Sequence, residues 1–94
     1  MTAGSEAFRR PVEVINARGL HARVAARIAA TAERFDAEVR VGCKGHDVSA
    51  LSIMGLLMLA ASTGARLDLV ATGAEAQAAV EALAALFAAG FEEA

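Results

Sequence analysis

The chain has 94 residues, which is enough for one domain and too few for a cofactor-binding fold joined to a separate substrate domain. Its net charge of −2 gives no electrostatic reason to expect a nucleic-acid partner. Its single cysteine, Cys43, cannot form an internal disulfide, which favours a reducing compartment. These properties favour a binding or carrier module over a complete enzyme.

The start of the chain is small and polar, so we expect residues 1–7 to be a disordered extension before a single domain of residues 8–94. The extension lacks the apolar segment of a secretory signal. The longest apolar run, 53–61, is about half of the roughly 20 residues that a bilayer span needs. The sequence therefore predicts a cytoplasmic protein that does not enter the membrane.

The first strand and the first helix are indicated by a change of period. Phe8, Val12 and Val14 alternate with polar residues, which predicts a strand over 8–16. From 21 to 35 the apolar residues recur every three or four positions, and this spacing predicts an amphipathic helix. Arginines gather on another face of that helix, where a solvated surface is the usual explanation.

The middle of the chain predicts a hairpin and a short, very apolar helix. We expect strands at 37–42 and 47–50, joined by a Lys-Gly turn. Ser52 then precedes the apolar run 53–59, whose residues cannot all be buried on two helical turns. They predict an exposed apolar patch of the kind that proteins keep for partners. The alternative is a helix that lies deeper in the core.

The last third of the chain predicts one more strand and one more helix. Apolar and charged residues alternate over 66–71, and an apolar stripe runs along 74–89. Gly90 is a typical residue for the end of a helix. Glu92 and Glu93 indicate a frayed acidic tail, or else a carboxylate that could pair with Arg23. The order β-α-β-β-α-β-α predicts one sheet with its helices on one face.

His21 stands at the expected start of the first helix, two residues before Arg23. Free backbone N–H groups and the helix dipole favour negative charge at such a position. Imidazole is a competent nucleophile near neutral pH, and an arginine can bind phosphoryl oxygens. A histidine before a helix is more often a cap or a solvated residue, so His21 alone does not decide its role.

Two segments together resemble a known family. Gly19-Leu20-His21-Ala22-Arg23 resembles the active-site segment of the histidine-containing phosphocarrier HPr of the phosphoenolpyruvate-dependent phosphotransferase system, the HPr/NPr-like family. Ser52-Ile53-Met54-Gly55-Leu56 resembles the regulatory-serine segment of the same family. The resemblance extends over residues 8–91. It implies an α+β open-faced β-sandwich, in which three helices cover one face of a four-stranded antiparallel sheet.

The resemblance also implies a function, which is that of a phosphocarrier rather than an enzyme, and no cofactor. His21 would accept a phosphoryl group from enzyme I, with Arg23 as its phosphate partner. It would donate the group to an EIIA-type protein, in sugar uptake or in nitrogen-linked regulation. Ser52 matches a serine that an HPr kinase/phosphorylase modifies, although helix capping explains this serine equally well.

Further expectations concern the partners and the ligands. The residues expected to dock partner proteins are Ile53, Met54, Leu57 and Arg27. We expect a monomer, and no metal site, because Cys43 and His46 offer too few ligands. A competing hypothesis is a ferredoxin-like regulatory domain that binds a small molecule, carries no labile phosphate and shares the β-α-β-β-α-β opening.

Three residues depart from the family's pattern. Val24 takes the place of the usual proline three residues after the histidine, where a helix's first turn would tolerate either residue. Leu51 stands where a lysine is common before the serine, and Ala60 replaces a common glycine. The change at Leu51 bears on recognition by a kinase.

Overall fold

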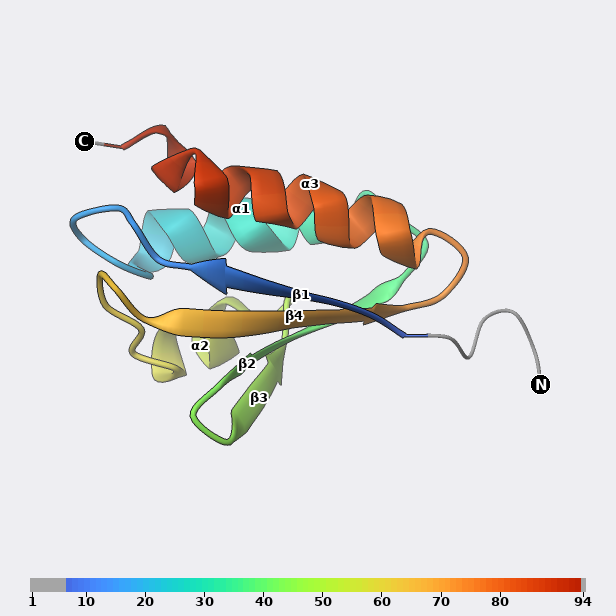
Figure 1. Cartoon of the computed structure of the whole chain (residues 1–94), viewed down its shortest axis with the longest axis horizontal. Coiled ribbons are helices and arrows are strands. Elements are labelled where there is room, and N and C mark those ends of the chain that lie inside the picture. The colour runs from blue at the N-terminus through green and yellow to red at the C-terminus, as the bar shows by residue number, and fades with distance from the viewer. Residues whose placement is uncertain (1–6, 94) are drawn as a thin grey trace.

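The computed structural model describes residues 7–93 and contains one sheet and three α-helices (Figure 1). The strands are β1 (Phe8–Glu13), β2 (Glu38–Cys43), β3 (His46–Ser49) and β4 (Arg66–Thr72). The helices are α1 (Ala22–Ala32), α2 (Ile53–Met58) and α3 (Ala76–Ala88), and a short turn, η2 (Gly90–Glu92), follows α3. The expected order of elements is confirmed. Of the expected disordered extension, residues 1–6 lie outside the described residues.

The four strands are ordered β1-β4-β2-β3, and every neighbouring pair is antiparallel. β1 therefore forms one edge of the sheet, and Pro11 in this strand lies opposite Asp68 of β4. A proline has no N–H to donate, so it is suited to an edge strand, which has no neighbour on its outer side.

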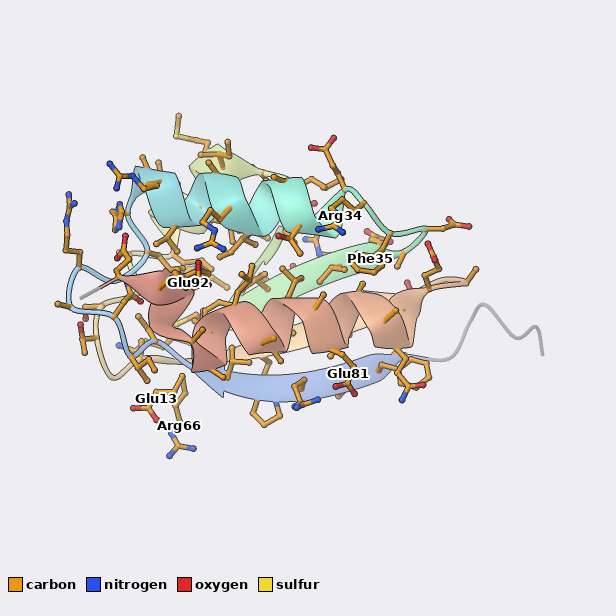
Figure 2. The ribbon with its side chains drawn as sticks, turned by 90° about the horizontal axis from the view of Figure 1, so that it is seen from above. Glu13, Arg34, Phe35, Arg66, Glu81 and Glu92 are labelled. Carbon is orange, nitrogen blue, oxygen red and sulfur yellow. The ribbon has the colours of Figure 1, made fainter. Side chains whose placement is uncertain are left out.

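The helices pack on the sheet and share one core with it. α1 and α3 lie side by side over the sheet (Figures 1 and 2), while α2 contacts α1 and β3. The buried residues of α3 are Ala76, Ala79, Val80, Leu83, Ala84 and Phe87. Because half of them are alanines, the helix can approach the sheet closely. The expected open-faced sandwich is confirmed.

The helix and strand bounds differ from the sequence pattern at the ends of α1 and β1. α1 ends at Ala32 rather than 35, because the N–H groups of Arg34 and Phe35 bond to carbonyls three residues back. β1 ends at Glu13 rather than 16. The side chain of Asn16 turns back instead and donates a hydrogen bond to the carbonyl of Gly19 at 2.8 Å.

The hairpin between β2 and β3 is closed by two left-handed residues. Lys44 has a φ of 53° and Gly45 a φ of 84°. Left-handed values at both positions are typical of the two-residue turn whose twist matches that of the flanking strands. The expected Lys-Gly turn is thus confirmed, with β3 beginning at His46. Within residues 7–93, no helix is long and apolar enough to cross a membrane.

Candidate functional site

His21 lies at the junction between the β1–α1 loop and the first turn of α1. Its backbone is extended, and its carbonyl accepts the N–H of Ala25 at 2.9 Å. Its side chain does not cap the helix. The N–H groups of Ala22, Arg23 and Val24 consequently have no acceptor within the described part of the chain. These donors make the start of α1 a favourable place for negative charge.

The loop that carries His21 is pinned to the loop between α2 and β4. The N–H of Leu20 donates to the carbonyl of Ala61 at 3.0 Å. Gly19 has a φ of +68°, and a Cβ atom at this position would lie 2.6 Å from the carbonyl oxygen of Ala61. Thr63 donates its hydroxyl to the carbonyl of Asn16 at 2.7 Å. The histidine is therefore presented by a closely packed loop.

The last described residues reach the same place. Oε2 of Glu93 lies 2.7 Å from Nε2 of His21, and each of these side chains is 17% exposed. Oε1 of Glu93 accepts a hydrogen bond from Nδ2 of Asn16 at 3.0 Å. The expectation of a frayed acidic tail was therefore wrong for Glu93. The alternative, pairing with Arg23, was also wrong, because Glu93 contacts His21 and Glu92 contacts Arg27.

The pKa of Glu93 results from opposed influences. Partial burial is the largest of them and on its own would raise the pKa of this carboxyl. The hydrogen bonds from His21 and Asn16, with the charges of His21 and Arg18, act in the other direction. Together they outweigh burial and hold the pKa of Glu93 below its ordinary value, so the group is a carboxylate at neutral pH.

Arginines surround the acidic residues beside the start of α1. A hollow of about 370 Å³ is lined by Arg18, Arg23, Arg27, Phe91, Glu92 and Glu93. Nη1 of Arg27 donates to the carbonyl of Phe91 at 2.8 Å and lies 3.5 Å from Oε1 of Glu92. Figure 2 shows Glu92 over the space between α1 and α3. Arg27, expected to dock partners, thus also holds the turn after α3.

Arg18 and Arg23 differ from Arg27 in their contacts. Both side chains are exposed, and neither makes a hydrogen bond or an ion pair with another residue of the range 7–93. Two guanidinium groups therefore line the hollow with their donors available to an anion.

Ser52 caps α2, as expected, by accepting the N–H of Gly55 at 2.9 Å. On this helix Leu56 is buried, whereas Met54 is 70% exposed and Met58 76% exposed. Leu57, expected on the exposed surface, packs partly against the core instead. The exposed apolar residues in and beside α2, which we call the α2 patch, are Leu51, Ile53, Met54 and Met58.

The structure adds two residues that the sequence pattern did not connect with His21. Asn16 is 2% exposed and is the one buried polar residue of the described range. A polar residue just before a turn was its only signal. Glu93 lies 72 positions from His21 and carried no signal of this contact.

The chain is similar to known proteins over most of its length. A family model described as "PTS HPr component phosphorylation site" matches residues 8–89. The chain is 42% identical to a phosphocarrier protein NPr from Shewanella violacea, with 90% of this chain and 93% of the relative covered. It is 41% identical to a phosphocarrier protein HPr from Cupriavidus necator, with 92% and 97% covered.

The solved structures lead to the same conclusion. The crystal structure of HPr-C-His from Thermoanaerobacter tengcongensis superposes with a TM-score of 0.88 at 36% identity, covering 93% of this chain and 98% of that one. These matches favour the phosphocarrier hypothesis over a ferredoxin-like small-molecule-binding domain. The chain belongs to the HPr/NPr family of phosphocarrier proteins of the phosphotransferase system.

Proposed function

We propose that this phosphocarrier accepts a phosphoryl group on His21 from enzyme I and donates it to an EIIA-type protein. The observation that supports this most strongly is the position of His21 at the start of α1, beside three N–H groups that have no acceptor among residues 7–93. Arg23 lines the adjacent hollow with its donors available. A phosphoryl group carries about −1.5 to −2 charges near neutral pH, which this surrounding would stabilise.

The transfer needs only a nucleophile and a stabilised product from this chain. A ring nitrogen of His21 attacks the phosphorus, the new N–P bond forms, and the bond from phosphorus to the donor atom of enzyme I breaks. Arg23 then binds the phosphoryl oxygens by charge-assisted hydrogen bonds. In the second transfer His21 is the donor: a nucleophile of the acceptor attacks the phosphorus, and the N–P bond of His21 breaks.

Intact mass after incubation with enzyme I and phosphoenolpyruvate tests the assignment of His21. We expect one added phosphoryl group that is lost in acid and stable in base, and its absence in His21→Ala. The matched control is His46→Ala, which removes the only other histidine, at the exposed start of β3. An unchanged yield in His21→Ala would reject the assignment.

The α2 patch and Arg27 are the surface on which we place the partners. Exposed methionines adapt to several partner surfaces, as a carrier that visits a donor and an acceptor requires.

We also infer that the chain works as a cytoplasmic monomer. Because both an HPr and an NPr protein are similar to this chain, it could serve either sugar uptake or nitrogen-linked regulation. Comparing its rates of phosphoryl transfer to a sugar-specific and to a nitrogen-branch EIIA protein distinguishes the two.

Ser52 is the residue at which we place regulation. Its hydroxyl already lies at the start of α2, where a phosphate would be electrostatically tolerated. The added charge would lie next to the α2 patch and weaken docking. Incubation with an HPr kinase and ATP should label the wild type and leave Ser52→Ala unlabelled. No labelling of the wild type would leave capping as the serine's role.

A further inference from the structure

The segment after α3 folds back onto the start of α1 through a run of left-handed residues. Gly90, Phe91 and Glu92 have φ values of 60°, 55° and 60°. Left-handed backbone is unfavourable for residues with a side chain, so tertiary contacts must hold this turn. The carbonyl of Phe91 accepts the hydrogen bond from Arg27 at 2.8 Å. The ring of Phe91 packs edge-on against Phe87, with centroids 4.9 Å apart.

This turn delivers Glu93 to His21 with both carboxylate oxygens occupied. Oε2 contacts Nε2 of His21 at 2.7 Å, and Oε1 accepts from Asn16 at 3.0 Å. Asn16 is itself fixed, because the same Nδ2 donates to the carbonyl of Gly19 at 2.8 Å and the residue is buried. The carboxylate is thus oriented from one side by a buried amide and faces the histidine on the other.

The contact between Glu93 and His21 decides where the ring carries its proton. A carboxylate accepts hydrogen bonds and donates none, so the hydrogen in the 2.7 Å contact belongs to Nε2 of His21. A neutral imidazole has one N–H, and its other nitrogen keeps a lone pair. In the ring of His21 that nitrogen is Nδ1.

We propose that Glu93 is a positioning residue for phosphoryl transfer, which holds His21 in the tautomer that presents Nδ1 as the nucleophile. The proposal rests on the proposed role of His21 as phosphoacceptor. Nδ1 forms the bond to phosphorus, and the donor atom that held the phosphoryl group takes back its bonding pair. His21 keeps the proton on Nε2, and Glu93 offsets the positive charge that the ring gains. Arg18 and Arg23 counter the repulsion between Glu93 and the incoming phosphoryl group.

Two substitutions at Glu93 separate the tautomer from simple loss of a contact. In Glu93→Gln, Asn16 still donates to the amide oxygen, so the amide NH₂ faces Nε2 of His21 and favours the tautomer with the proton on Nδ1. Glu93→Ala removes both contacts and leaves the tautomers mixed. The matched control is Glu81→Gln on α3. It also removes one carboxylate, from a side chain that is 56% exposed and pairs with Arg10.

The tautomer is measured from the ¹⁵N chemical shifts of the His21 ring, and the rate from single-turnover phosphorylation by enzyme I. We expect wild type and Glu81→Gln to carry the proton on Nε2. We expect Glu93→Gln to move it to Nδ1 and to react roughly tenfold more slowly or worse, the effect of one charge-assisted hydrogen bond. Phosphoramidate, a small donor that needs no docking, should show the same ranking.

The outcomes distinguish this proposal from the function on which it rests. A wild type that takes up no phosphoryl group contradicts the proposed function, whatever the tautomer. A wild type that is phosphorylated, with equal rates and an unchanged tautomer in both Glu93 variants, overturns the role of Glu93 alone. Slower reaction with enzyme I but not with phosphoramidate also overturns it, since Glu93 would then act in docking. Melting temperatures check that the variants remain folded.

Discussion

The substitution Gly19→Ala tests the close contact that positions His21. At a φ of +68°, a Cβ atom would lie 2.6 Å from the carbonyl oxygen of Ala61 and 3.0 Å from Cα of Ser62. Both are backbone atoms, so no rotation of a side chain relieves the overlap, and the loop after α2 must move. The hydrogen bond from Leu20 to Ala61, 3.0 Å long, would lengthen or break.

We expect Gly19→Ala to lower the free energy of unfolding by about 2–4 kcal/mol. The left-handed backbone accounts for about 1–2 kcal/mol of this. The lost hydrogen bond contributes about 1 kcal/mol, and the displaced loop the remainder. Urea unfolding followed by circular dichroism measures the change. Because the same loop carries His21, phosphorylation by enzyme I should also slow down.

Gly64→Ala is the matched control for Gly19→Ala. Gly64 also has a left-handed backbone, with a φ of +92°, but a Cβ atom there would meet nothing within 4 Å. Gly64→Ala therefore bears the conformational cost alone, about 1–2 kcal/mol. Equal losses of stability in the two variants would refute the argument, because the contact with 61–62 would then add nothing.

Four further results are expected. Arg23→Ala should slow phosphoryl transfer roughly ten- to hundredfold with the fold intact, as measured by quenched-flow assays. A wild-type rate in this variant would show that Arg23 belongs only to the solvated face of α1. Met54→Asp should weaken binding to enzyme I in calorimetry without lowering the melting temperature, whereas unfolding would place Met54 in the core. Ser52→Ala should lower the free energy of unfolding by about 1 kcal/mol, because the N–H of Gly55 loses its cap. Ser52→Asp should keep the cap and transfer phosphate more slowly than wild type, with a smaller loss of rate than in Met54→Asp. Because the folded-state pKa of Glu93 is lowered, its stabilisation is present above its ordinary value of 4.5 and lost below it, so acid titration should destabilise wild type more steeply than Glu93→Gln.

Most of the fold was predictable because its signals are local. The alternation in β4 and the three-to-four-residue spacing in α1 and α3 each reflect which side chains face the core. The Lys44-Gly45 turn has a sequence signature, and Ser52 is a preferred helix cap. The ends of elements were less predictable, since a hydrogen bond from the side chain of Asn16, rather than a change of period, redirects the chain after β1.

The site was predictable only in its local half. The segment around His21 and Arg23 is contiguous, so the sequence displays it. The contact with Glu93 depends on a left-handed turn that contains Phe91 and Glu92, residues that rarely adopt such backbone, and no local pattern predicts it. Leu57 was misplaced for a related reason. On so short and apolar a helix, periodicity cannot say which side packs against the core.

Pro11 has a consequence for how this protein behaves in a crowded solution. A sheet edge normally presents a row of unpaired backbone groups to which a strand of another chain can bond. In β1 the row is interrupted at its centre, because Pro11 has no N–H, and charged residues stand before it at Arg10 and after Val12 at Glu13. A strand of another chain that meets the β1 edge therefore finds a poor template for extending the sheet, which leaves β3 as the edge with an uninterrupted row.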